Sequence, residues 1–168
     1  MSISACVIAK EQSRLIEQCL ESINHLVDEI IVVDTGDTNN TIKVAKEFNA
    51  KVINTKFEND FSKIRNLAIE NATKDWILTI DCDESLNVSD LNTLIDIMEE
   101  KSMVACSFKL VNVIKKTEQD GPYCVRLFKN HEGFHYKGKR KEQIIDSIYS
   151  KYDKASLCTC DIKLYHFK

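Results

Sequence analysis

Residues 75–84 of the chain read Asp-Trp-Ile-Leu-Thr-Ile-Asp-Cys-Asp-Glu, an apolar run that ends in a cluster of carboxylates. The run predicts a strand that is buried on both faces and carries Asp81, Asp83 and Glu84 at its carboxyl end. Carboxylates two residues apart can share one hard divalent ion, which can bridge two phosphate oxygens and neutralise the charge of a leaving group. The alternative is an acidic turn that caps the next helix.

This strand is the last element of the first half of the chain, in which strands and helices alternate. Apolar patterns predict strands over 3–8, 29–33, 51–54 and 76–80, with helices over 13–24, 38–48 and 61–71 between them. Strand-helix-strand units form right-handed crossovers, so we expect an open, mostly parallel, Rossmann-like α/β sheet with helices on both faces. A ligand would then bind after the strands, at residues 9–11, 34–37, 55–57 and 81–84.

Beyond residue 84 the pattern changes. A helix is predicted over 89–100, followed by strands over 103–114 and 123–128. The polar segment 115–122 is expected to connect the two strands, with Gly121 and Pro122 in a turn or at a strand edge. We therefore predict antiparallel C-terminal additions to one sheet, and a single domain over residues 1–168.

Composition excludes several classes of function. Twenty-three basic residues against 26 acidic ones give a net charge of −3, so no strong basic field would attract nucleic acid or an anionic membrane. No apolar run approaches the roughly 20 residues that span a bilayer, and no charged region typical of a signal peptide opens the chain. Seven cysteines, without Cys-x-x-Cys spacing, indicate reduced thiols, and we expect a soluble protein in the cytoplasm.

Two further motifs lie beside the predicted crevice. Asp34 ends a strand in Asp-Thr-Gly-Asp-Thr, where it could accept hydrogen bonds from a ribose or a base, or simply belong to a capped turn. Lys63 and Arg65 lie in the first turns of a helix, the end at which the helix dipole disfavours cations. Either an anion lies nearby, or these residues form a solvated helix face.

Taken together and in order, these motifs resemble the family 2 glycosyltransferases, whose shared fold is the GT-A nucleotide-sugar domain. The resemblance covers nearly the whole chain. It rests on residues 6–10 (Cys-Val-Ile-Ala-Lys), 30–36 (Ile-Ile-Val-Val-Asp-Thr-Gly), 60–62 with Arg65 and Asn66, 75–84, 126–130 (Arg-Leu-Phe-Lys-Asn) and Tyr136-x-Gly138.

The resemblance implies an inverting, metal-dependent hexosyl or related transferase that uses a nucleotide-diphosphate sugar, with uridine favoured as the base. Residues 1–84 would bind the nucleotide, and residues 85–168 would form the acceptor side. Asp81 and Asp83 would hold manganese or magnesium, with Asp83 as the direct ligand; His166 would complete the site, unless it is merely structural. The residues implied to contact the nucleotide are Ile8, Ala9, Glu11, Asp34, Arg65, Asp81 and Cys82.

The chain departs from the family pattern at two places. Lys10-Glu11-Gln12 stands where relatives commonly have Lys-Asn-Glu, and Arg140-Lys141-Glu142-Gln143 stands where they often have Val-His-Glu-Gln. Glu142 keeps the acidic position and is our predicted catalytic base, with Glu84 next. The sequence also ends two residues after His166, so part of an acceptor surface is expected to be missing.

Two other functions compete with transfer. The departure at residues 140–141 would suit a catalytically weakened nucleotide-sugar-binding module that acts as a partner subunit. A nucleotidyltransferase also places a carboxylate-bound metal on a similar sheet, but residues 9–14 contain no glycine for a phosphate loop. The acceptor is not indicated by any motif, and an exposed strand edge in the antiparallel part would allow a homodimer.

Overall fold

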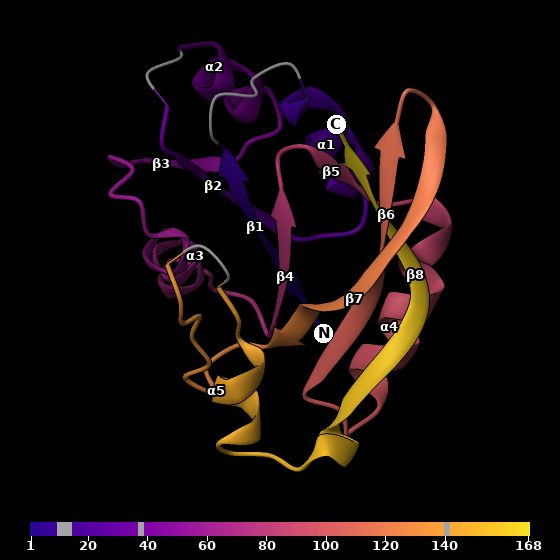
Figure 1. The fold of residues 1–168 in the computed structure, drawn as a ribbon. Helices are drawn as coiled ribbons and strands as arrows, with labels where there is room; N and C mark the ends of the chain where they lie inside the picture. The colour runs from indigo at the N-terminus through magenta and orange to yellow at the C-terminus, as the bar shows by residue number, and fades with distance from the viewer. Residues whose placement is uncertain (10–14, 37–38, 140–141) are drawn as a thin grey trace.

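The structure is a computed structural model that describes residues 1–9, 15–36, 39–139 and 142–168. Strands and helices alternate through the first half of the chain, and long strands dominate the second (Figure 1). The elements are β1 (Ile3–Ala9), α1 (Ile16–Ile23), β2 (Glu29–Asp34), α2 (Asn39–Glu47), β3 (Lys51–Asn54), α3 (Phe61–Glu70), β4 (Trp76–Asp81), β5 (Glu84–Ser85), α4 (Leu91–Glu99), β6 (Ala105–Ile114), β7 (Thr117–Lys129), α5 (Ile145–Tyr149) and β8 (Leu157–Phe167), with short 3₁₀ turns at Val88–Asp90 and Lys154–Ser156.

The described strands form one eight-stranded sheet in the order β3-β2-β1-β4-β7-β6-β8-β5. Strands β3, β2, β1 and β4 are parallel, whereas β7 is antiparallel to both β4 and β6. This arrangement confirms the predicted mixed α/β sheet with a parallel N-terminal half. Because β2 and β4 flank β1 on opposite sides, the chain reverses its direction of winding at β1, and a crevice opens at the carboxyl ends of β1 and β4.

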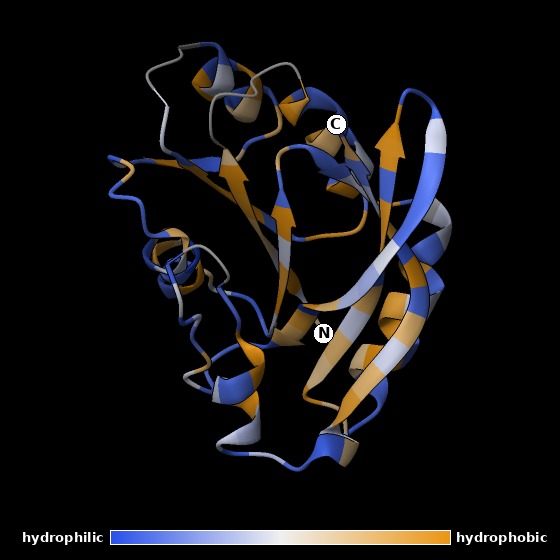
Figure 2. Cartoon of the chain, viewed as in Figure 1, coloured by the Kyte–Doolittle hydropathy of each residue, from blue (hydrophilic) through white to orange (hydrophobic). Residues whose placement is uncertain are grey.

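Helices cover both faces of the sheet, as the crossover rule predicts. Alternate residues of β1 point to opposite faces of the sheet. Ala5 and Val7 pack with α1, α2 and α4 on one face, and Cys6 and Ile8 pack with α3 and α5 on the other. Figure 2 shows the central strands as mainly hydrophobic. Strands buried on both faces need continuous apolar runs, which explains why the strand patterns of the first half were readable from sequence.

The hairpin of β6 and β7 differs from the prediction of a long connector over 115–122. Its turn is only Lys115 and Lys116, both with positive φ (48° and 66°), as in the tight turns that match strand twist. Pro122 lies inside β7, where the pairing with β6 shifts register between Lys109 and Val111. A proline without an amide hydrogen is tolerated at such a bulge, so this residue did not end the strand.

The last strand, β8, returns the end of the chain to the crevice. It runs parallel to β6 along most of its length, and Tyr165 and His166 pair antiparallel with the two residues of β5. Because β5 directly follows β4, this pairing brings His166 next to the acidic cluster. Within the described part of the chain, no helix has both the length and the apolar character needed to cross a membrane.

Candidate active site

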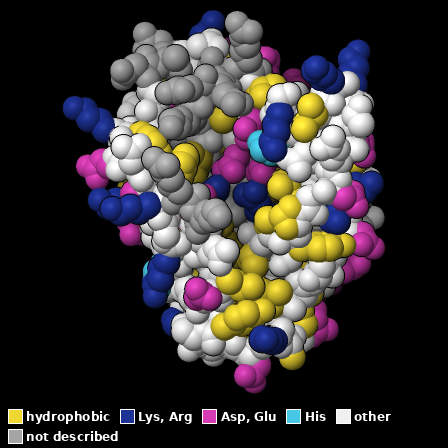
Figure 3. Space-filling view, viewed as in Figure 1, with side chains coloured by type: hydrophobic (Ala, Val, Ile, Leu, Met, Phe, Trp, Pro, Cys, Tyr) yellow, Lys and Arg dark blue, Asp and Glu magenta, His cyan; other side chains and the backbone are white. Residues whose placement is uncertain are grey.

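Polar side chains gather where β1, β2 and β4 end. Asp34 is the last residue of β2 and Asp81 the last of β4, and Ala9 ends β1 between them. Figure 3 shows a hollow on this face, with acidic and basic side chains at its floor and apolar side chains along one rim. The predicted ligand edge of the sheet is therefore also the hollowed and charged part of this face.

Arg65 is the centre of the charge network at this edge. Helix α3 begins after Asp60, whose side chain accepts hydrogen bonds from the amides of residues 62 and 63, and Arg65 follows in the first turns. Its Nη2 lies 2.9 Å from Asp81 Oδ1, and its Nε donates to Glu142 Oε1 at 2.9 Å. Arg65 is only 8% exposed, so the solvated-face interpretation is wrong for this residue.

Burial lowers the pKa of Arg65, but Asp81, Tyr136 and Glu142 outweigh it and hold that pKa well above its usual value. The guanidinium also lies over the ring of Tyr136, 5.4 Å from its centroid. Its Nη1 is buried without a hydrogen-bond partner among the described residues. Arg65 is thus a permanent cation that holds Asp81 and Glu142 in place. Lys63, by contrast, is exposed and pairs with the exposed Glu58 at 3.0 Å. The interpretation as a solvated helix face therefore fits Lys63.

Glu84 and Arg126 form a second, more deeply buried pair. Arg126 Nη2 donates to Glu84 Oε1 at 2.6 Å, and Glu84 Oε2 accepts the amide hydrogen of Asp81 at 2.9 Å. Glu84 is 3% exposed, and burial raises its pKa to about 7 even though Arg126 opposes the shift. Both of its oxygens are engaged in holding the end of β4. This engagement argues against Glu84 as the catalytic base.

Asp81 lies between the two arginines. Burial raises its pKa, but Arg65 and Arg126 together outweigh burial and lower the pKa below its usual value. Arg126 Nη1 is 4.0 Å from Asp81 Oδ2. Asp81 is therefore ionised at neutral pH and already has one close cation, so Asp83 is the carboxylate of the pair that is more available to a metal.

Asp83 and His166 meet, although 83 positions separate them. His166 Nε2 lies 3.2 Å from Asp83 Oδ2, and the Phe167 amide donates to the Asp83 carbonyl at 2.9 Å. Two ligands of one metal ion, each about 2.1 Å from it, lie about 3 Å apart at adjacent corners of an octahedron. The two side chains therefore fit two of the three metal ligands that the resemblance implies; the third is Asp81, whose carboxylate is bound by Arg65. Among the described residues, no three His, Cys, Asp or Glu side chains form a metal cage, so a metal here would need ligands from substrate and water as well.

The residues predicted to contact the nucleotide surround this network. Asp34 is 2% exposed, and its Oδ1 accepts the amide hydrogen of Gly36 at 3.0 Å. The carbonyls of Ile8 and Ala9 accept hydrogen bonds from the amides of Cys82 and Thr35, both at 3.0 Å. The Cys82 side chain is buried in the core under α1, so only its backbone borders the site. Glu11 lies outside the described residues.

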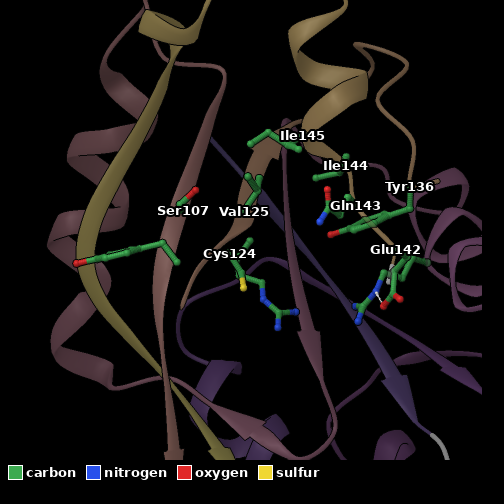
Figure 4. Close-up of a pocket in the computed structure, with 11 residues that line it drawn as sticks. Ser107, Cys124, Val125, Tyr136, Glu142, Gln143, Ile144 and Ile145 are labelled. Atoms are coloured by element: carbon green, nitrogen blue, oxygen red, sulfur yellow. Dashed lines mark hydrogen bonds and ion pairs between the residues drawn. The ribbon is translucent and has the colours of Figure 1, made fainter. Parts of the chain in front are cut away.

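A pocket opens beside the charge network, with a volume of about 360 Å³. Figure 4 shows Tyr136, Glu142 and Gln143 on one side of it, facing Cys124 and other residues of β6 and β7 on the other. Its lining residues are Arg65, Ser107, Tyr123, Cys124, Val125, Arg126, Tyr136, Glu142, Gln143, Ile144 and Ile145. The motifs that contain Arg126 and Tyr136 do not place either residue in this charge network, because only their contacts with Glu84 and Arg65 reveal that role.

Sequence comparisons with known proteins show which family this chain resembles. Residues 4–168 match the family model described as Glycosyl transferase family 2. A TPR repeat-containing protein of Synechococcus elongatus is 35% identical over 150 residues, which cover 87% of this chain and 36% of that protein. The chain therefore spans about a third of that relative's length.

Solved structures share the fold at low sequence identity. The crystal structure of S. aureus TarS 1-349 superposes with a TM-score of 0.76 and 16% identity, covering 99% of this chain and 60% of that one. Glucosyl-3-phosphoglycerate synthase from Mycobacterium tuberculosis, in complex with Mn²⁺ and UDP-glucose, gives a TM-score of 0.53 and 22% identity over 65% of this chain and 43% of that one. With a family model matched from residue 4 to residue 168, the chain belongs to glycosyl transferase family 2.

Proposed function

We propose that this domain transfers a hexosyl or related sugar from a uridine diphosphate donor to a hydroxyl acceptor, with inversion and with the help of a divalent metal. The observation that carries the proposal is the 3.2 Å approach of His166 to Asp83 at the end of β4, beside the ionised Asp81. The Mn²⁺ and UDP-glucose in the M. tuberculosis relative support the choice of metal and nucleotide.

Asp83 and His166 would hold manganese or magnesium, and phosphate oxygens and water would complete the coordination. When bound, the metal would neutralise the charge that develops on the departing diphosphate. Asp81 would accept hydrogen bonds from the donor while Arg65 keeps it ionised and in place. Asp34, held at the end of β2 by Gly36, is our proposed contact for the uracil or ribose, and Arg65 is a further proposed contact of the nucleotide.

Glu142 is the proposed base. It lines the pocket, and Arg65 holds its Oε1 at 2.9 Å, so the carboxylate is both oriented and next to the donor side. An acceptor hydroxyl in the pocket would give its proton to Glu142 as its oxygen bonds to the anomeric carbon. The bond from that carbon to the diphosphate oxygen breaks, and its electron pair leaves with the diphosphate. Direct displacement of this kind inverts the anomeric centre.

Glu142→Gln is expected to lower kcat for transfer by about 100- to 10,000-fold, the range typical of a lost general base, with little change in UDP affinity. Glutamine keeps an oxygen that accepts from Arg65 Nε, so the charge network stays assembled except for one charge. Steady-state kinetics and calorimetry on the same preparation separate the two effects. The exposed Glu58→Gln is the matched control and should leave kcat unchanged. Full turnover by the Glu142 variant would exclude this residue as the base.

The first test of the proposed function is calorimetric titration of UDP into the protein with Mn²⁺ and with a chelator, followed by assays of donor hydrolysis and transfer. Metal-dependent binding with hydrolysis or transfer is the expected result. Metal-dependent binding without either reaction would favour a nucleotide-sugar-binding module. No binding of UDP under any condition would overturn the choice of uridine, and GDP and CDP would be titrated next.

A further inference from the structure

The ring of His166 contacts an oxygen atom through each of its nitrogens. Nε2 lies 3.2 Å from Asp83 Oδ2, and Nδ1 lies 3.2 Å from Oδ1 of Asn112, near the carboxyl end of β6. Asn112 and His166 are direct partners in the parallel pairing of β6 with β8, so the contact is built into the register of the sheet. No motif in the sequence had indicated Asn112.

Hydrogen-bond chemistry determines what these two contacts require. The amide oxygen of Asn112 only accepts, so Nδ1 of His166 must carry a hydrogen to bond with it. In a neutral imidazole the other nitrogen, Nε2, then presents a lone pair toward the carboxylate of Asp83. A lone pair and a carboxylate oxygen repel each other until a cation, either a proton on Nε2 or a metal ion, lies between them. With hydrogen on Nδ1, Nε2 is the ring nitrogen that faces Asp83 and takes up that cation.

We propose that Asn112 is a positioning residue of the metal site: its Oδ1 holds His166 in the tautomer that carries hydrogen on Nδ1 and aims the Nε2 lone pair at the space beside Asp83. The inference rests on the proposed metal-dependent function, because it names the residue that orients one of the two proposed ligands. Outer partners of this kind fix both the tautomer and the direction of a ligating histidine.

The surroundings of Asn112 support a defined position for its amide. Gly121 of β7 lies beside this amide: a Cβ there would lie 3.3 Å from Asn112 Nδ2 and 3.0 Å from the carbonyl oxygen of Leu110, so a larger residue would crowd the amide. Gln119 is the β7 partner of Asn112 and is exposed. Gln119 therefore offers a control position that neighbours Asn112 in the sheet and has a similar amide side chain.

The test begins with a readout that needs no metal. Long-range ¹H–¹⁵N NMR of labelled histidine, in metal-free protein at pH 8, reports which ring nitrogen of His166 carries hydrogen, and His166→Gln assigns the signal. We expect hydrogen on Nδ1 in the wild type and in Gln119→Ala, and a shift toward hydrogen on Nε2 in Asn112→Leu. Hydrogen on Nε2 in the wild type, a doubly protonated ring, or an unchanged tautomer in Asn112→Leu would each overturn the proposal.

The second readout is Mn²⁺ affinity in the presence of UDP, measured from the free Mn²⁺ signal in electron paramagnetic resonance. Asn112→Leu is expected to weaken binding by about 10- to 100-fold, as loss of an outer partner typically does. Asn112→Asp keeps an oxygen acceptor and should stay within a few-fold of the wild type, as should Gln119→Ala. An Asn112→Asp variant as weak as Asn112→Leu would contradict the role of the acceptor. If the wild type has the expected tautomer but binds no Mn²⁺, the proposed metal-dependent function fails while the positioning role of Asn112 stands.

Discussion

Asp83→Ala is expected to abolish Mn²⁺-dependent binding of UDP and to lower kcat/KM for transfer by about 1,000-fold. A metal that stabilises a leaving diphosphate contributes several kcal/mol to the transition state, and each 1.4 kcal/mol is a factor of ten in rate. Asp83 is the proposed direct ligand, and its partner His166 cannot hold the ion alone. Titration calorimetry of UDP with and without Mn²⁺, together with initial-rate kinetics, measures both effects.

The control for this variant is Asp161→Ala, which removes an exposed carboxylate from β8 and should change neither binding nor rate. Thermal melting of both variants tests whether the fold is retained. The side chains of Asp83 and His166 are both partly exposed, so we expect Asp83→Ala to lose little stability. If Asp83→Ala binds UDP and Mn²⁺ as the wild type does, the metal site is elsewhere, and the proposed role of His166 fails with it.

Among the proposed variants, Arg126→Met is expected to lose the most stability, about 3 to 5 kcal/mol in the free energy of unfolding. Removing one partner of a buried ion pair leaves the other group charged without compensation, or makes it take up a proton, in a low-dielectric interior. Because burial already raises the pKa of Glu84 to about 7, the full loss is expected above that pH, where Glu84 is ionised in the wild type. Glu84 would lose its 2.6 Å partner while 97% of its surface stays inaccessible to water. Because a typical domain is stable by only about 5 to 15 kcal/mol, the loss should be evident in urea denaturation followed by circular dichroism.

A double-mutant cycle distinguishes the lost pairing from lost packing. Arg126→Met combined with Glu84→Gln should recover most of the stability, since the uncompensated charge is gone and glutamine can still accept from the Asp81 amide. Lys109→Met is the matched control, because its 3.4 Å pair with the exposed Asp120 should contribute no more than about 1 kcal/mol. A double variant as unstable as Arg126→Met alone would mean that the arginine stabilises the fold through packing.

Local patterns predicted most of the parallel half of the sheet. Its strands are continuous apolar runs. The strand Lys51–Asn54 has the predicted bounds, and the strand Trp76–Asp81 is one residue longer than predicted. The antiparallel half was predicted less well, because the first residues of β7, 117–120, are all exposed and polar or charged and so carry no apolar pattern. Residues 115–122 therefore resembled a connector although all but two of them belong to β7.

By itself, the sequence determined the fold class, the family resemblance and the acidic cluster at the end of β4, because each is read from short local motifs and from their order along the chain. The tertiary structure alone decided which polar side chains meet: Arg65 with Glu142 across 77 positions, Arg126 with Glu84 across 42, and His166 with Asn112 across 54. These contacts follow from the order and register of strands in the sheet. The periodicity of apolar residues along the chain does not specify the order of the strands. The contacts of Asp81 with two arginines and the orientation of His166 therefore depend on the complete sheet.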